Sequence, residues 1–379
     1  MDVGWNEVRA RRLARSSLSE RANGDRLVDV AGAVCGVHAQ VQAAAELQLA
    51  ARVDGVTQAD VRATLWEQRA LVKAWTLRGT LHLHPAGELP LWLAARRAVL
   101  RPADEGLPVW PDPAGVVHPA LGADEVAAVR AAVWEALDGR CLLRHELAEA
   151  VVERVGAAPR ERLRSGFAFF FSDLCQGPPQ GSRITLARPD QWIASWQEVD
   201  EHEALREVCR RFLRAYGPAR PEDFSAWFGS ATFRVTEART LFGELAGELA
   251  EMDVDGRAYF VLADDRSFSP LSPQTRLLPE YDVYVMGFRE RDQLVPAPVR
   301  ELIAVHGRGR YEGPAATRLV LVDGVAAGLW ERKKRGRRLE LQIRLAHRVE
   351  KTARAELEHE AERFGAFLGL EPVLSVDPS

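Results

Sequence analysis

The stretch LVKAWTLRGTLHLH, residues 71–84, decides the fold of the first third of the chain. Its apolar and polar residues alternate with a period of two, which predicts strands at 71–77 and 80–84 around a turn at Arg78 and Gly79. The segments before it have helical periodicity instead, and helices closed by a hairpin form a winged helix. The preceding helices are expected at residues 6–15, 26–37, 43–51 and 59–68.

The same order of elements recurs twice along the chain. After a further helix that ends near Leu100, a proline-rich stretch forms a linker. Beyond it we expect helices at 124–137, 142–155 and 160–175 with a strand at 182–187, then helices at 201–216, 221–228 and 235–245 with strands joined by Asp255 and Gly256. The repeat is architectural, because the units share no sequence identity.

The last part of the chain has a different character. The segments LLPEYDVYVMGF (277–288), RLVLVDGVAAGLW (318–330) and LELQIRL (339–345) predict a sheet. A helix at 348–368 is expected to close the chain, followed by a loose tail at 371–379. The predicted division is a winged helix at 1–100, a linker at 101–121, winged helices at 122–199 and 200–265, and a β-rich region with a basic hairpin and final helix at 266–379. The fold class is therefore α+β.

The tip of the last predicted hairpin is strongly basic. It spans ERKKRGRRLE, residues 331–340, with acids only at the two ends, Glu331 and Glu340. Such a tip is a candidate for binding phosphate groups. The alternative is a solvated turn, because Lys and Arg also protect sheet edges from aggregation. The basic residues are Arg332, Lys333, Lys334, Arg335, Arg337 and Arg338.

Composition limits the classes of protein to which the chain can belong. The 379 residues are 47% hydrophobic and 27% charged, which is ordinary for a globular protein of two or three domains. No segment resembles an export signal or a membrane span, so we expect a cytoplasmic protein without membrane contact. The four cysteines are scattered and predict neither a zinc site nor disulfides. The net charge of −4 argues against a nucleic-acid partner unless positive charge is locally concentrated.

A second stretch, VCGVHAQVQAAAELQLAAR at 34–52, contains two neutral amides, Gln40 and Gln42, around Val41. Residues two apart on an α-helix lie about 200° apart around its axis, so both glutamines cannot face one substrate from a helix. We expect the preceding helix to end near His38, the next to start near Ala43, and Val41 to point into the core. The alternative is that both glutamines merely cap a helix-turn-helix elbow.

Four segments together resemble the AlkZ-type DNA glycosylases, a tandem winged-helix superfamily, over most of the chain. They are GVHAQVQAAAELQLAARV, AWTLRGTLHLHPAGELP, LLPEYDVYVMGFRER and GVAAGLWERKKRGRRLELQI. That family's catalytic motif is a glutamine, an aliphatic residue and a second glutamine, which Gln40, Val41 and Gln42 match. A sister branch has aspartate at the last position. The proline usual a few residues after the motif is replaced here by alanines.

The resemblance implies a monofunctional glycosylase, with three winged-helix units around a basic DNA channel. Its expected substrate is double-stranded DNA that carries alkylated guanine, including bulky natural-product adducts and interstrand crosslinks, in antibiotic self-resistance or alkylation repair. Alkylation at N7 makes guanine a cationic leaving group, so two amides that orient water are sufficient. A bulky adduct is not expected to rotate into a tight pocket. We expect no cofactor, no metal and a monomer. The alternatives are a winged-helix transcriptional regulator without catalysis and a drug-sequestering protein.

Other residues near the motif are weaker candidates. His38 is expected to contact a phosphate or the leaving base, and Lys73 and Arg78 to contact phosphates from the first hairpin. His82 and His84 lie on one strand face, where a metal would need a third ligand. Glu46 follows Gln42 by one turn and would either stabilise a developing cation or cap the helix. For Tyr281 and Asp282 we expect a structural role.

Overall fold

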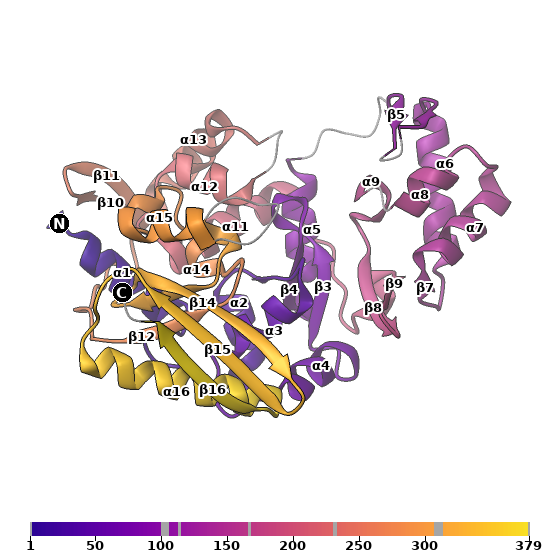
Figure 1. The fold of residues 1–379 in the computed structure, drawn as a ribbon. Helices are drawn as coiled ribbons and strands as arrows, with labels where there is room; N and C mark the ends of the chain where they lie inside the picture. The colour runs from indigo at the N-terminus through magenta and orange to yellow at the C-terminus, as the bar shows by residue number, and fades with distance from the viewer. Residues whose placement is uncertain are drawn as a thin grey trace.

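The computed structural model describes residues 2–99, 106–112, 115–165, 168–229, 233–306 and 314–377, so parts of the predicted linker, including Pro102 and Pro113, lie outside it. Helices and strands alternate in an α+β arrangement, with one lobe set apart from the larger body (Figure 1). The helices that the structure describes are all too short or too polar to cross a membrane.

The first unit supplies the predicted helices and hairpin. Strands β3 and β4 pair antiparallel, with Lys73 opposite Leu83, and the short strand β2 joins the edge of β4. A capping box begins α4, because the Thr57 side chain accepts a hydrogen bond from the Asp60 backbone and the Asp60 side chain accepts one from the Thr57 backbone. The bounds are β1 Asp2–Val3, α1 Trp5–Arg15, α2 Leu27–Ala33, β2 Val37–His38, α3 Gln42–Ala50, α4 Gln58–Trp66, β3 Leu71–Trp75, β4 Leu81–Pro85 and α5 Leu89–Arg97.

The second group of elements forms the separate lobe. Its strands continue the sheet of the first unit in the order β2-β4-β3-β8-β9-β7, because Ala74 of β3 pairs with Cys175 of β8. A small apolar cluster at this junction combines residues of β3 and α5 with Cys175, Ala187 and Trp192. The bounds are β5 Trp110–Pro111, β6 Val117–His118, α6 Ala123–Ala136, β7 Leu142–Leu143, α7 Arg144–Val155, α8 Arg160–Ser165, α9 Ala168–Phe171, β8 Cys175–Gln180, β9 Arg183–Ala187 and α10 Pro189–Trp192.

The third group repeats the pattern in the larger body. Its hairpin turns at Asp255 and Gly256, both with positive φ, as the sequence predicts for an Asp-Gly turn. The N-terminal strand β1 pairs with this hairpin, parallel to β10. Three helical groups are thus each followed by a hairpin that pairs with one short extra strand, and their assignment as winged helices stays a prediction. The bounds are α11 Glu201–Tyr216, α12 Pro221–Phe228, α13 Val235–Glu244, β10 Leu249–Val254 and β11 Arg257–Leu262.

The C-terminal region forms a five-stranded sheet, β12-β13-β14-β15-β16, backed by the long helix α16. Its apolar face shares one core with the helices of the first unit, so the two regions are packed as one body. The bounds are β12 Thr275–Leu278, α14 Val283–Met286, α15 Ala297–His306, β13 Leu319–Val322, β14 Val325–Arg335, β15 Arg338–Leu345, α16 Lys351–Leu368 and β16 Glu371–Asp377.

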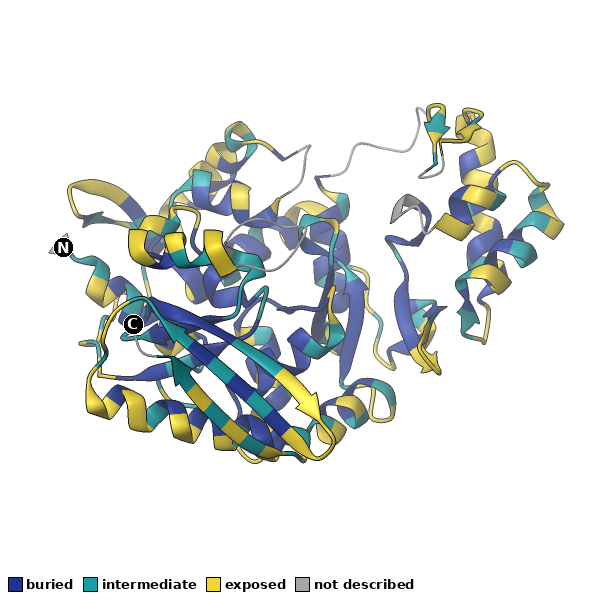
Figure 2. Cartoon of the chain, in the orientation of Figure 1, coloured by how far each residue is buried: buried dark blue, intermediate teal, exposed yellow. Residues whose placement is uncertain are grey.

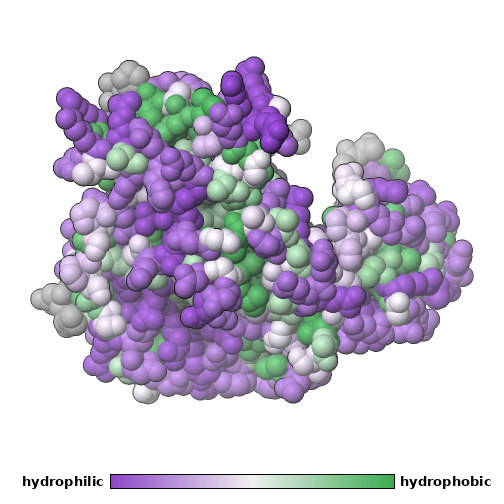
Figure 3. All heavy atoms as spheres, turned by 90° about the horizontal axis from the view of Figure 1, so that it is seen from below, coloured by the Kyte–Doolittle hydropathy of each residue, from purple (hydrophilic) through white to green (hydrophobic). Residues whose placement is uncertain are grey.

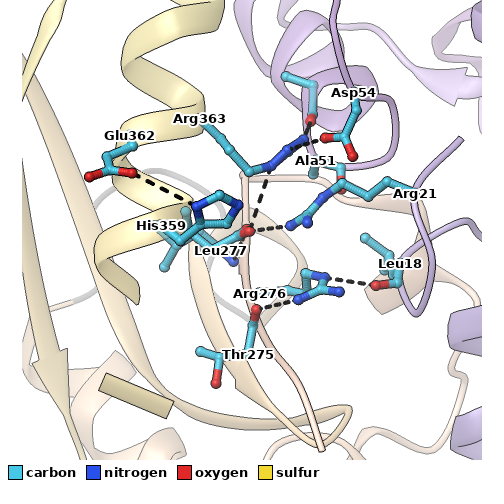
Figure 4. Close-up of polar contacts among 12 residues, drawn as sticks. Leu18, Arg21, Ala51, Asp54, Thr275, Arg276, Leu277, His359, Glu362 and Arg363 are labelled. Carbon is cyan, nitrogen blue, oxygen red and sulfur yellow. Dashed lines mark hydrogen bonds and ion pairs between the residues drawn. The ribbon is translucent and has the colours of Figure 1, made fainter. Parts of the chain in front are cut away.

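Arginines fasten this region to the N-terminal helices (Figure 4). Arg363 of α16 binds the Asp54 carboxylate at 2.6 Å and the Ala50 carbonyl at 2.8 Å, just beyond and at the end of α3. Arg276 of β12 donates to the Leu18 carbonyl at 2.7 Å. The contact with Ala50 satisfies a carbonyl that the end of α3 leaves unpaired, so the C-terminal region holds α3 in place.

Four expectations about local structure are wrong. The tail predicted at 371–379 is instead strand β16, which pairs parallel with β15, although residues 378 and 379 lie outside the described chain. The helix predicted at 160–175 gives way to strand β8 at Cys175, and its residues 166 and 167 are not described. The helix predicted at 26–37 ends at Ala33. In these three cases a strand pairing that is distant in sequence overrides the local pattern. The fourth is the segment 277–288, expected to belong to the sheet, of which residues 283–286 form the short helix α14 capped by Asp282.

Candidate active site

The two glutamines lie at a break between β2 and α3. Val41 is the N-cap residue of α3, with extended φ and ψ of −108° and 107°, and Gln42 is the first helical residue. No continuous helix runs through 38–46, as the spacing of the two amides requires. The expected burial of Val41 is wrong, because it is 42% exposed, while Ala39 and Ala45 take the inward positions. The break therefore presents Gln40 and Val41 to solvent.

The side-chain amide of Gln42 is held at both ends. Lys73 of β3 donates from Nζ to Gln42 Oε1 at 2.9 Å, and Gln42 Nε2 donates to Glu46 Oε1 at 3.3 Å. Glu46 is fully buried and also accepts from Gln58 at 2.6 Å and from Arg62 at 2.8 Å, both on α4. The carboxylate is thus paired, which burial of a charge requires.

The Gln40 amide is anchored at one end only. Its Oε1 accepts from the backbone N–H of Leu81 in β4 at 3.3 Å. Among the residues that the structure describes, none forms a hydrogen bond with its Nε2, and the side chain is exposed. An amide nitrogen carries two donors, so Gln40 presents these donors outward while its carbonyl is used internally.

Behind the motif lies a group of buried aromatic and imidazole rings. The His38 ring packs edge-on against His82, with centroids 5.3 Å apart, and against Tyr281 at 5.2 Å. Burial, with Arg78 and Lys73 nearby, lowers the pKa of His38 to about 4, so this ring is neutral near pH 7. His38 is 4% exposed and packs beneath the motif, and its expected contact with a phosphate or the leaving base stays a prediction.

Lys73 and Arg78 also point inward. Lys73 is 5% exposed and its ammonium contacts Gln42. Arg78 donates to the Trp227 carbonyl in α12 at 2.5 Å and contacts His82 Nε2 at 3.0 Å, so it ties the first hairpin to the third group of elements. Lys73 is buried and Arg78 is half-buried, and a phosphate contact by either of them stays a prediction. Their positions assign both of them to internal contacts.

The basic hairpin of β14 and β15 behaves differently, because its tip is exposed. Figure 2 shows the strands changing from buried near the sheet centre to exposed at the turn. Arg335 is paired with Glu340 at 2.9 Å and Arg338 lies 3.7 Å from Glu371, whereas Lys333, Lys334 and Arg337 are exposed. Arg332, at the base of the hairpin, is half-buried, and burial is the main cause that lowers its pKa.

The hairpin and the motif are neighbours in space. A hollow of about 330 Å³ is lined by Arg332, Lys334 and Arg318 from the sheet and by Gln58 from α4. Gln58 also donates to Glu46, which accepts from Gln42, so the Gln58 side chain lies between the hollow and the Glu46 carboxylate. In Figure 1 the hairpin tip lies beside α4. The hollow beside Lys334 is thus connected to Gln42 through Gln58 and Glu46.

Comparison with known proteins places the chain in a family. The model of the family described as DNA glycosylase AlkZ-like matches residues 31–367. The chain belongs to the AlkZ-like DNA glycosylases. A curated relative from Streptomyces sahachiroi, named interstrand DNA cross-link repair glycosylase, is 33% identical over 87% of this chain and 88% of its own length. The solved structure of the Streptomyces sahachiroi DNA glycosylase AlkZ matches with a TM-score of 0.83 and 30% identity, covering all of both chains.

Membership of the AlkZ-like family makes this protein an enzyme that acts on DNA, and the reading as a regulator without catalysis is set aside.

Within the described ranges, no group of three or more His, Cys, Asp and Glu residues is arranged to hold a metal. Figure 3 shows a mostly hydrophilic face with small apolar patches and a notch between the lobe and the body.

Sequence reasoning missed part of the AlkZ-like site. Gln58 and Arg62 are four residues apart, so they share one face of α4, but nothing local indicates that this face meets Glu46. Arg318 was also missed, and it forms a double hydrogen bond with Glu280 at 2.6 and 2.8 Å. The structural role expected of Asp282 is confirmed, because it caps α14 and pairs with buried Arg52.

Proposed function

We propose that this protein hydrolyses the N-glycosidic bond of N7-alkylguanine in double-stranded DNA. The observation that carries the proposal is the chemistry of the exposed motif: two neutral amides with fixed partners, and one carboxylate nearby that is fully buried and fully engaged. Such a site offers hydrogen bonds and no strong base, acid or nucleophile. Its substrate must therefore arrive with an activated leaving group, which alkylation at guanine N7 provides.

The reaction balances without a protein acid. The bond between C1′ and N9 breaks with its electron pair going to N9, which neutralises the cationic base, and water forms a new bond to C1′. The proton lost by that water passes to solvent. Gln42 accepts a hydrogen bond from the water with its remaining carbonyl lone pair, and Gln40 donates from Nε2 to a sugar or phosphate oxygen. When these groups hold the water and the sugar in place, the reactants lose less translational and rotational entropy on reaching the transition state, and the activation barrier is lower.

The openness of the motif supports action on bulky adducts and interstrand crosslinks without rotation of the base into a tight pocket. Gln40 and Val41 are exposed rather than enclosed. An adduct that remains in the duplex can approach an exposed motif, whereas base-flipping enzymes enclose the extruded base. The exposed cations of Lys333, Lys334 and Arg337 are the proposed phosphate contacts, and Arg332, Arg335 and Arg338 line the hairpin that positions them.

The proposal is tested by incubating the purified protein with a duplex that contains N7-methylguanine and with a crosslinked duplex. We expect free alkylguanine and an abasic site, and we expect the variant Gln40→Ala, Gln42→Ala to lose at least about 100-fold in single-turnover rate while it still binds DNA. Undiminished release by the double variant would remove the assignment. A matched control is Gln293→Ala. Gln293 is also exposed, but it lines a different hollow, beside Trp5, to which the motif contributes no residue.

A further inference from the structure

The Gln42 amide lies between two buried charges of opposite sign. Lys73 Nζ contacts its oxygen at 2.9 Å and Glu46 Oε1 contacts its nitrogen at 3.3 Å. Lys73 is 5% exposed and Glu46 is fully buried, so solvent screens neither contact strongly. Glu46 itself is fixed by two hydrogen bonds from Arg62 and one from Gln58. The carboxylate on one side of Gln42 is therefore held by α4, and the ammonium on the other side extends from strand β3.

These partners allow only one orientation of the amide. A lysine ammonium is a donor without an acceptor, and a carboxylate is an acceptor without a donor. A flipped Gln42 would direct its NH2 at the ammonium and its carbonyl at the carboxylate, so both hydrogen bonds would become repulsive contacts. Leaving buried polar groups unsatisfied in this way costs about 1 to 3 kcal/mol for each group. One N–H and one carbonyl lone pair of Gln42 remain for the substrate.

We propose that Lys73 is a positioning residue that, together with Glu46, fixes the orientation of the Gln42 amide for the reaction on DNA. The inference rests on the proposed function of Gln42, and it adds a role that the exposed motif alone does not reveal. Without the lysine only Glu46 holds the amide, so the flipped orientation becomes more populated, and in it the substrate-facing lone pair is replaced by an N–H that cannot accept a hydrogen bond from water.

The charge state of Lys73 provides a readout of this role. Burial lowers the pKa of Lys73 to about 8, and Glu46 opposes that shift. The other titratable group near the ammonium is His38 of β2, which is neutral near pH 7 because burial lowers its pKa to about 4. Above pH 8 the neutral amine has a lone pair and can accept from a flipped amide, so only the Glu46 carboxylate still opposes that orientation and the preference for one orientation weakens.

The test compares single-turnover base release by the wild type and by K73M, K73R and E46Q, with Lys351→Met as a matched control at an exposed lysine. We expect K73M and E46Q to be about 10- to 100-fold slower at pH 7 with unchanged affinity for the duplex, and K73R to recover part of the rate. Equal rates for K73M and wild type overturn the proposal. Absence of base release by the wild type would instead overturn the proposed function.

The pH profile keeps the test decisive where a substitution lowers stability. The ratio of the wild-type rate to the K73M rate cancels the ionisation of the substrate itself. We expect this ratio to decrease as pH rises through about 8, because the wild type loses its ammonium there and K73M has none to lose. A ratio that stays constant or rises between pH 7 and pH 9 overturns the proposal. If K73M does not fold, the same ratio is measured with K73R, which keeps its charge over this range.

Discussion

Arg52 and Asp282 form an ion pair in which both side chains have zero exposure, and the Arg52 guanidinium meets the carboxylate through two nitrogens at 2.6 and 2.8 Å. Arg52 follows α3 and Asp282 caps α14, so the pair joins the active-site helix to the C-terminal region. Removing one charge leaves its partner buried and uncompensated, which is more costly than removing both.

We therefore expect Asp282→Asn to lower the free energy of unfolding by about 3 to 5 kcal/mol, as measured by urea denaturation. An asparagine oxygen can still accept the hydrogen bond from the Tyr284 N–H that caps α14, so the loss of unfolding free energy measures the effect of removing the charge. The double variant Arg52→Met, Asp282→Asn should be more stable than the sum of the two single losses implies. Additive losses would contradict the coupling of the two side chains.

His84 makes stability depend on pH. It is fully buried, its Nε2 contacts Thr76 Oγ1 at 2.9 Å, and burial lowers its pKa to about 3. Between about pH 6.5 and pH 3 the unfolded chain binds a proton at this residue and the native protein does not, so stability decreases as pH falls. At pH 5 the loss from His84 is about 2 kcal/mol. In His84→Gln, the difference in unfolding free energy between pH 7 and pH 5 should shrink by about that amount; an unchanged difference would contradict the assignment.

At the scale of elements, the hairpin of β14 and β15 is where DNA affinity should depend on salt. Each phosphate contact releases counterions, so we expect the triple variant Lys333→Ala, Lys334→Ala, Arg337→Ala to reduce the slope of log K against log salt by about 3. The slope is measured by duplex binding between about 50 and 300 mM salt, a range that includes the concentration at which the Debye length is about 10 Å. The control replaces Arg348, Lys351 and Arg354, exposed cations near the start of α16, and an equal reduction there would argue against a role for the hairpin.

Elements with strong local signals were predictable. Helix α11 has the predicted bounds because Asp200 caps its start with a hydrogen bond to the Glu203 N–H and the sequence Gly217-Pro218 ends it. Strand β16 was missed because its pairing with β15 is parallel and spans helix α16. In the site, the glutamines were found by resemblance and by their spacing. Gln58 could not be found, because its contact depends on how α3 and α4 pack.

At the scale of the whole molecule, the described residues join the lobe to the body through the pairing of β3 with β8 and a small apolar cluster beside it. Trp192 is 6% exposed there, and the Arg69 guanidinium lies 4.0 Å above its ring. The lobe also has its own core, built around α6 and α7. We expect Trp192→Ala to cost about 3 kcal/mol and to raise amide hydrogen exchange in β8 more than in α6 or α16. Uniform changes across the chain would contradict a localised junction.

The two ends of the described chain both lie within sheets. Asp2 pairs with Asp253 in β10, and β16 at 371–377 pairs with β15 along its whole length. During synthesis on the ribosome, β1 must therefore wait for the third group of elements. The hairpin of β14 and β15 likewise leaves the ribosome before β16, the strand that pairs with the edge of β15. A nascent chain thus carries the exposed cations of the hairpin and an unpaired edge of β15 together until α16 and β16 have emerged.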